Sequence, residues 1–157
     1  MSMRADALAL LAAEMPDGPA LLAALALPFR RSIRLHPLRG TPTGWGELTA
    51  VPWHAAGRFT VGSADPAGFL DYHTGLAYPQ DAASQVPVLL LAPQPGEVVV
   101  DACAAPGSKS TQIGLALGDS GLLICCDASA PRRAVLTENL ARQGVACALV
   151  TPLPVHA

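Results

Sequence analysis

Residues 101–110 read D-A-C-A-A-P-G-S-K-S and directly follow the apolar run V-V-V at positions 98–100. The β-branched run predicts a strand, and we expect a helix after the turn. A strand that ends on an acid and enters a helix through small residues lets backbone N–H groups approach a ligand closely. Pro106 stiffens this turn, and Ser108 is the predicted helix cap. The stretch therefore predicts a cofactor loop in a doubly wound α/β fold.

Two common nucleotide-binding loops do not fit this stretch. A dinucleotide fingerprint requires G-x-G-x-x-G, whereas Gly107 is the only glycine between Asp101 and Ile113. A P-loop requires lysine directly after its second glycine, whereas Ser108 separates Gly107 from Lys109. The remaining candidate is the loop with which class I methyltransferases bind S-adenosylmethionine.

The same residues resemble the cofactor motif of RNA cytosine-5 methyltransferases of the Sun/Fmu and RsmF type, whose members read close to D-x-x-A-A-P-G-S-K-T. Residues 75–91, G-L-A-Y-P-Q-D-A-A-S-Q-V-P-V-L-L-L, are similar to the family segment before the cofactor strand. Residues 28–39, P-F-R-R-S-I-R-L-H-P-L-R, are similar to the family's arginine-rich stretch. The resemblance implies an α/β fold: the first half of a Rossmann-like class I methyltransferase domain at residues 65–157, preceded by a small α+β region at residues 1–64.

The second strand supports the cofactor hypothesis independently. Residues 121–126 form a short apolar run that Asp127 closes, and an acid in this place can accept hydrogen bonds from ribose hydroxyls. The alternative for Asp127 is a helix-capping acid. The family places a basic residue near Arg132 beside the cofactor. Lys109 is the only lysine, and its ammonium can hold the methionine carboxylate of the cofactor or attract an RNA phosphate. The alternative is a solvent-exposed residue in the first turn of the helix.

The cofactor implied by the resemblance is S-adenosylmethionine. Its expected binding residues are Cys103, Ala104, Ala105, Pro106, Gly107, Ser108, Lys109, Asp127 and Arg132. Gln80 and Asp81 are expected to support this site or the RNA site, with Asp81 capping a helix that Pro87 kinks or restarts. At the end of the third strand, Leu153 and Pro154 stand where many relatives place an adenine contact, so that contact is in question.

Arginines dominate one short stretch of the N-terminal region. Four of the ten basic residues, Arg30, Arg31, Arg34 and Arg39, fall in it, and the alternation around Arg34 predicts a strand. Arginines on a strand can contact RNA phosphates or protect a solvated edge strand from pairing. The resemblance favours RNA, with ribosomal RNA as the expected partner, although the net charge of −2 gives the whole chain no general attraction to polyanions.

The catalytic half of the family's domain is expected to be missing. Cytosine-5 chemistry needs a thiolate that adds to C6 and a base that removes the C5 proton. The family supplies two cysteines in Pro-Cys and Thr-Cys motifs, and these 157 residues contain neither pair. The four cysteines here suit small buried side chains, and neither they nor the scattered histidines have the spacing of a metal site. We therefore expect no catalytic residue and no metal in this chain.

Composition sets the remaining expectations. The alanine- and leucine-rich runs at 5–13 and 20–27 are interrupted at 14–18 and fall short of the ~20 residues of a membrane span, so two short helices are predicted. Sparse cysteines favour the cytoplasm. The first strand's bare edge predicts aggregation, self-association or a second chain that supplies missing strands. Two alternative functions stay open: a non-catalytic RNA-binding module, and one piece of a split enzyme.

Overall fold

The computed structural model describes residues 2–62 and 65–152. The chain divides into two compact units, Met1–Arg30 and Arg31–Ala157. The first unit contains α1 (Ser2–Ala13) and α2 (Gly18–Leu25), which confirms the prediction of two short helices. Gly18 packs so tightly against the end of α1 that an added Cβ would overlap the Ala12 carbonyl. The calls on Leu153 and Pro154 lie outside the described residues.

The second unit begins with an antiparallel sheet, which we call sheet A. Its order is β2-β3-β1-β4, and the strands are β1 (Ser32–Leu35), β2 (Leu48–Val51), β3 (His54–Thr60) and β4 (Ala77–Pro79). Between β3 and β4 lie the 3₁₀ turn η1 (Pro66–Gly68) and the short helix α3 (Leu70–His73). A small core forms around Ile33 and Trp45, whose ring stacks on Phe69 at 4.6 Å between centroids.

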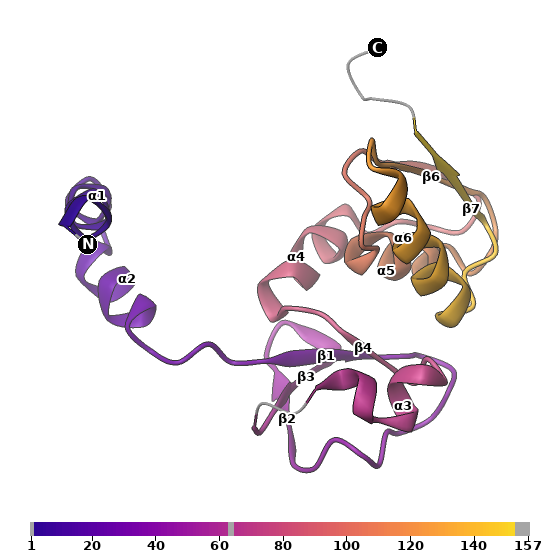
Figure 1. The fold of residues 1–157 in the computed structure, drawn as a ribbon, viewed down its shortest axis with the longest axis horizontal. Helices are drawn as coiled ribbons and strands as arrows, with labels where there is room; N and C mark the ends of the chain where they lie inside the picture. The colour runs from indigo at the N-terminus through magenta and orange to yellow at the C-terminus, as the bar shows by residue number, and fades with distance from the viewer. Residues whose placement is uncertain (1, 63–64, 153–157) are drawn as a thin grey trace. The chain divides into compact units, whose positions relative to one another are not determined.

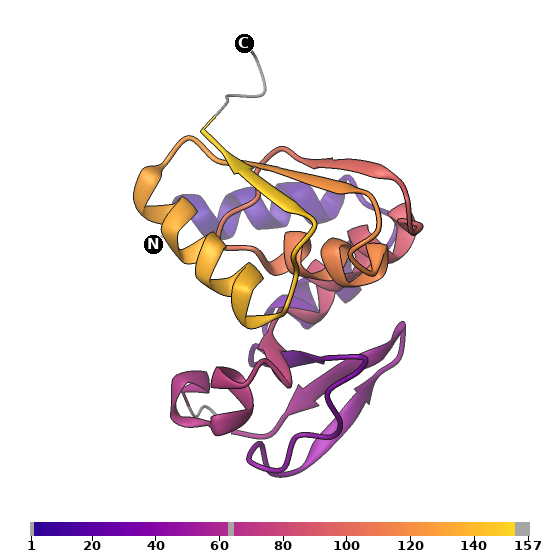
Figure 2. The same cartoon turned by 90° about the vertical axis from the view of Figure 1, so that its right-hand side faces the viewer.

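The chain then builds a parallel sheet, sheet B, with the order β5-β6-β7. The strands β5 (Val98–Asp101), β6 (Leu122–Cys126) and β7 (Ala148–Thr151) lie where the sequence predicts them. Helix α4 (Ala82–Leu91) precedes β5, and α5 (Ser108–Leu117) and α6 (Ala130–Arg142) form the two crossovers (Figures 1 and 2). This is the βαβαβ pattern of a Rossmann-like fold.

Helices α5 and α6 cover one face of sheet B. Leu123 and Cys125 of β6 are completely buried there against Leu117 of α5 and Leu136 of α6. Side chains alternate along a strand, so the intervening residues point to the opposite face. That face is open in the described chain, where Val98, Val100, Leu122 and Leu149 are 67%, 57%, 37% and 55% exposed.

The two sheets belong to one compact unit. The predicted domain boundary at residues 64 and 65 stays a prediction, but β4, which follows it, pairs with β1, which precedes it. Residues on both sides of the predicted boundary therefore belong to the same sheet.

Candidate cofactor-binding site

The loop from β5 to α5 has a backbone shape that its sequence explains. Gly107 adopts φ +108°, and an added Cβ would lie 3.0 Å from Leu136 Cδ1, so only glycine fits without strain. Gly107, and not Ser108 as predicted, is the N-cap of α5, and no side chain accepts a hydrogen bond there. The first-turn N–H groups are therefore left for a bound ligand, which is favourable for an anionic group.

Hydrogen bonds fix this loop to both neighbouring strands. Asp101 Oδ2 accepts a 2.7 Å hydrogen bond from Ser110 Oγ, and Asp101 Oδ1 accepts one of 3.3 Å from the Cys103 N–H. The Ala104 N–H donates to Cys126 O at 2.9 Å. Because the anchors come from β5, β6 and α5, the loop is held in shape before any ligand binds.

Asp127 lies at the end of β6, beside this loop, and is only 6% exposed. Its Oδ1 accepts the Ser129 N–H at 3.0 Å, and its Oδ2 pairs with Arg132 Nη1 at 3.3 Å. A carboxylate offers about four acceptor sites, so roughly two remain for ribose hydroxyls. The alternative, a helix-capping acid, does not fit, because Ser129 is the N-cap of α6 and no side chain caps that helix. The Ser129 bond only closes the turn before α6.

Arg132 connects the two halves of the site. Besides its ion pair with Asp127, it donates from Nη2 to Ala105 O at 2.6 Å. Its side chain is 58% exposed, so it has room to move when a ligand arrives. The structure thus places Arg132 between the loop and the acid, and its contact with the cofactor stays a prediction.

Lys109 does not extend freely into solvent. Its Nζ lies 3.2 Å from Ser84 Oγ on α4 and donates a hydrogen bond to it. Asp81 caps α4 by accepting the Ala83 N–H at 2.9 Å, as predicted. Pro87 does not restart α4, which continues from Ala82 to Leu91, and a kink at Pro87 stays a prediction.

The cysteines differ in exposure. Cys125 and Cys126 are buried as expected, whereas Cys103 is exposed on the loop, because the turn there points its side chain away from the core. Burial raises the pKa of Cys125 to about 11, and burial followed by the nearby Asp119 raises the pKa of Cys147. Neither thiol forms a nucleophilic thiolate near neutral pH. The described residues contain no cluster suited to a metal ion.

The four predicted RNA-contacting arginines are in three different environments. Arg30 and Arg31 have exposed side chains. Arg39 is partly buried and donates from Nη1 to Thr74 O and Arg142 O at 2.7 and 2.8 Å. Arg34 is 2% exposed. The predicted contact of Arg34 with RNA phosphate does not fit this structure, because the guanidinium is inside the unit.

A buried polar network surrounds Arg34 and was not foreseen. Its members outside β1 lie just after β4, in α4, α5 and α6, and at the residue that follows α6. Gln85 and Gln143 are 0% and 1% exposed. Gln80 accepts from Arg34 Nη1 at 2.7 Å and donates from Nε2 to Gln112 Oε1 at 2.9 Å. Asn139 of α6 donates to Pro106 O of the loop at 2.7 Å. These residues pack beneath the cofactor loop, and Gln80 is the one among them that the sequence singled out as a supporting residue.

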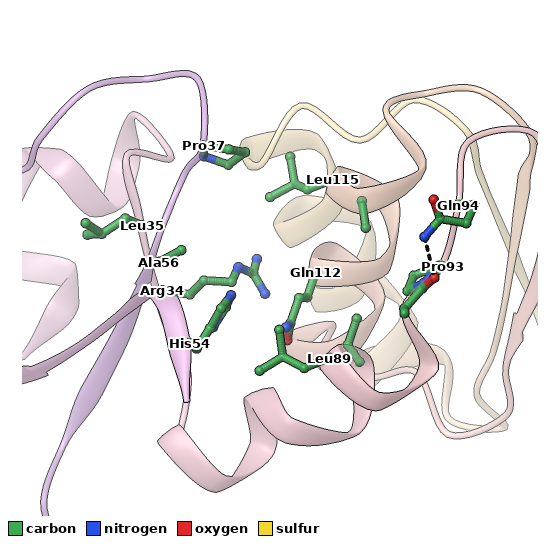
Figure 3. A pocket seen from close by; sticks show the side chains of 13 residues that line it. Arg34, Leu35, Pro37, His54, Ala56, Leu89, Pro93, Gln94, Gln112 and Leu115 are labelled. Carbon is green, nitrogen blue, oxygen red and sulfur yellow. Dashed lines mark hydrogen bonds between the residues drawn. The ribbon is translucent and has the colours of Figure 1, made fainter. Parts of the chain in front are cut away.

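A cavity of about 430 Å³ lies between sheet A and the helices α4 and α5 (Figure 3). Its lining is mostly apolar and includes Leu89 and Leu115, with Arg34, His54 and Gln112 among its polar residues. None of the cofactor-loop residues and no part of Asp127 lines it, so this cavity is separate from the candidate site.

None of the described helices is both long and apolar enough to cross a membrane.

The comparisons with solved structures define the class of protein. A methyltransferase homologue from Pyrococcus horikoshii superimposes with a TM-score of 0.78 at 26% identity, covering 88% of this chain and 48% of that one. NSun6 from Pyrococcus horikoshii, crystallised with the S-adenosylmethionine analogue SFG, gives a TM-score of 0.55 at 32% identity, covering 60% and 24%. The fold is that of a Rossmann-like methyltransferase, as the sequence predicts.

Sequence comparisons narrow the class to a family. Residues 88–153 match the 16S rRNA methyltransferase RsmB/F family. The tRNA (cytosine(49)-C(5))-methyltransferase of Pyrococcus abyssi is 36% identical, over 88% of this chain and 47% of its own length. The ribosomal RNA small subunit methyltransferase F of Klebsiella pneumoniae is 39% identical, over 83% and 30%. The chain is thus related to the RsmB/F-type RNA cytosine-5 methyltransferases, and it spans less than half the length of these two relatives.

Proposed function

We propose that this chain is the cofactor-binding part of an S-adenosylmethionine-dependent RNA cytosine-5 methyltransferase. One observation above all supports the proposal: the rigid loop at Ala104–Lys109 enters an uncapped helix while a buried acid, Asp127, ends the adjacent strand. The class I cofactor has an anionic methionine end and a ribose diol, which match the helix N-terminus and the acid respectively.

The residues present fit each end of this cofactor. The first-turn N–H groups of α5 and the Lys109 ammonium suit the methionine carboxylate, and Gly107 and Ala104 have no bulk to obstruct it. The open acceptor sites of Asp127 suit the ribose hydroxyls. The bound cofactor supplies an activated methyl group, and this part of the chain holds and orients it.

The acceptor would be a cytosine in RNA, and we favour ribosomal RNA because the RsmF relatives act on it. The relative from Pyrococcus abyssi acts on tRNA instead. The exposed Arg30 and Arg31 are the best-placed candidates for phosphate contact among the four predicted arginines. An RNA-binding module without catalysis is the alternative, and absence of cofactor binding would favour it.

We infer that methyl transfer needs cysteines from a further polypeptide segment. The base must be attacked by a thiolate, and the Pro-Cys and Thr-Cys pairs that supply the cysteines in the family do not occur in these 157 residues. Burial also raises the pKa of Cys125 and Cys147. Sheet B offers a place for such a segment, because β5 has one hydrogen-bonded neighbour and the sheet's second face is open in the described chain. Parallel sheets normally have both faces covered.

The decisive experiment is calorimetric titration of the chain with S-adenosylmethionine, alongside Asp127→Ala. We expect saturable binding that weakens at least about tenfold in the variant, since the ribose loses a charged acceptor. Glu138→Ala removes the same charge from an exposed position on α6 and is the matched control. Circular dichroism must show that all three proteins are folded. If the folded chain binds no cofactor, the proposal fails.

A further inference from the structure

The side chain of Arg34 is a buried cation without a counter-ion. It is 2% exposed, and the groups that accept its hydrogen bonds are amide, hydroxyl and backbone oxygens, none of them a carboxylate. Burial lowers the pKa of Arg34 to about 10, so the guanidinium stays charged at neutral pH. An unneutralised buried charge costs several kcal/mol unless something offsets it. A buried charge that is kept at this energetic cost indicates that the charge itself has a function.

The contacts of Arg34 lead to the first turn of α5. Nη1 donates to Ser108 O at 3.1 Å and Nη2 to Thr111 Oγ1 at 2.9 Å. Thr111 Oγ1 in turn donates to Gly107 O at 2.7 Å. Figure 3 shows Arg34 extending from β1 toward α5, beside Gln112. The guanidinium charge therefore lies against the turn that ends the cofactor loop.

The remaining partners are neutral. Nη1 also donates to Gln80 Oε1 at 2.7 Å and Nη2 to Gln143 Oε1 at 3.3 Å, and the Tyr78 ring centroid lies 5.3 Å from the guanidinium carbon. Nε is buried without any partner. Neutral oxygens accept the hydrogen bonds of the guanidinium group without cancelling its charge. Its positive electrostatic potential therefore extends to the N-terminus of α5.

We propose that Arg34 is a positioning residue that gives the cofactor site its preference for a carboxylate. The guanidinium holds the turn at Gly107–Thr111 and adds a fixed positive charge to the helix dipole on the side away from the ligand. The inference rests on the proposed S-adenosylmethionine site. A carboxylate at the first turn would lie within about 10 Å of this charge, since one helical turn rises 5.4 Å. At that range, in a partly buried site, the charge changes affinity by about tenfold.

The test compares two ligands, one with and one without the amino-acid end that carries the carboxylate and the ammonium. S-Adenosylhomocysteine carries the amino-acid end, whereas 5′-methylthioadenosine keeps the adenosine and the thioether but lacks that end. We expect Arg34→Gln and Arg34→Met to weaken S-adenosylhomocysteine binding about tenfold and methylthioadenosine binding less than threefold. Arg34→Lys keeps the charge and should restore the preference for the carboxylate. Calorimetry gives both affinities, with folding checked by circular dichroism.

A purely structural role predicts a different pattern. If Arg34 only holds the loop, both ligands weaken equally in the neutral variants and Arg34→Lys does not restore the ratio, which overturns the inference. Arg58→Gln removes an arginine from β3, where Arg58 Nη1 donates to Ala55 O and Gly57 O, and should leave the ratio unchanged. If the wild-type chain binds neither ligand, the cofactor site itself fails, which is a separate result from equal weakening.

Discussion

At the scale of single residues, His36 is a buried titratable group that directly follows β1. It is 7% exposed, lies 3.2 Å through Nε2 from Gln143 O, and accepts the Leu38 N–H on Nδ1 at 3.1 Å. Both ring nitrogens are therefore used by the neutral tautomer. Burial, followed by the charge of Arg39, lowers its pKa below the ordinary value of 6.5.

We predict that stability falls as the pH drops below about 6.5 because of this residue. A base with a lowered folded-state pKa binds more protons when unfolded, so its contribution is complete above 6.5 and decreases toward the folded pKa. Protonation also removes the acceptor of the Leu38 N–H, a loss of about 1 kcal/mol. Urea unfolding measures the free energy of unfolding at pH 7 and at pH 5. His36→Gln should reduce the difference between these two free energies. His73→Gln, on α3, should not.

At the scale of elements, α5 depends on a close approach to the segment before β7. Gly114 is buried in α5, and an added Cβ would lie 2.2 Å from Val145 Cγ1. A glycine inside a helix costs up to ~1 kcal/mol relative to alanine, so its presence in α5 needs a reason. The structure supplies the reason: the helix must approach Val145 without a side chain between them.

We predict that Gly114→Ala destabilises the chain by about 1–3 kcal/mol, despite the better helix propensity of alanine. Val145→Ala makes room, so the double variant should recover part of the loss, giving a coupling energy of about 1 kcal/mol in a double-mutant cycle. Urea unfolding of the four proteins measures this. Additive losses would mean that Val145 is not the obstacle.

At the scale of the whole molecule, the second unit has a parallel sheet of which one face is open in the described chain. The open face presents Val98 and Val100 of β5 with Leu122 and Leu149, and β5 has one paired edge. An exposed apolar strand edge is prone to pairing with another chain. The self-association expected from the sequence therefore has a definite surface.

We predict that Val100→Lys shifts the chain toward monomer in sedimentation velocity, because a charge on this face opposes strand and face pairing. Leu38→Lys is the control, since Leu38 is 88% exposed and lies outside sheet B. Equal behaviour of both variants, or a wild-type chain that is already monomeric at tens of micromolar, would contradict the prediction.

The sequence by itself determined the parts of this protein that depend on neighbours along the chain. The V-V-V run, the small residues with Gly107 and the acid at 127 act within one strand–turn–helix unit, so strand positions and the cofactor loop were predictable. The environments of Arg34 and Gly114 were decided only by the tertiary structure. Their partners lie dozens of residues away, as with Arg34 and Gln143, and burial without a local pattern turns a predicted RNA contact into an internal cation.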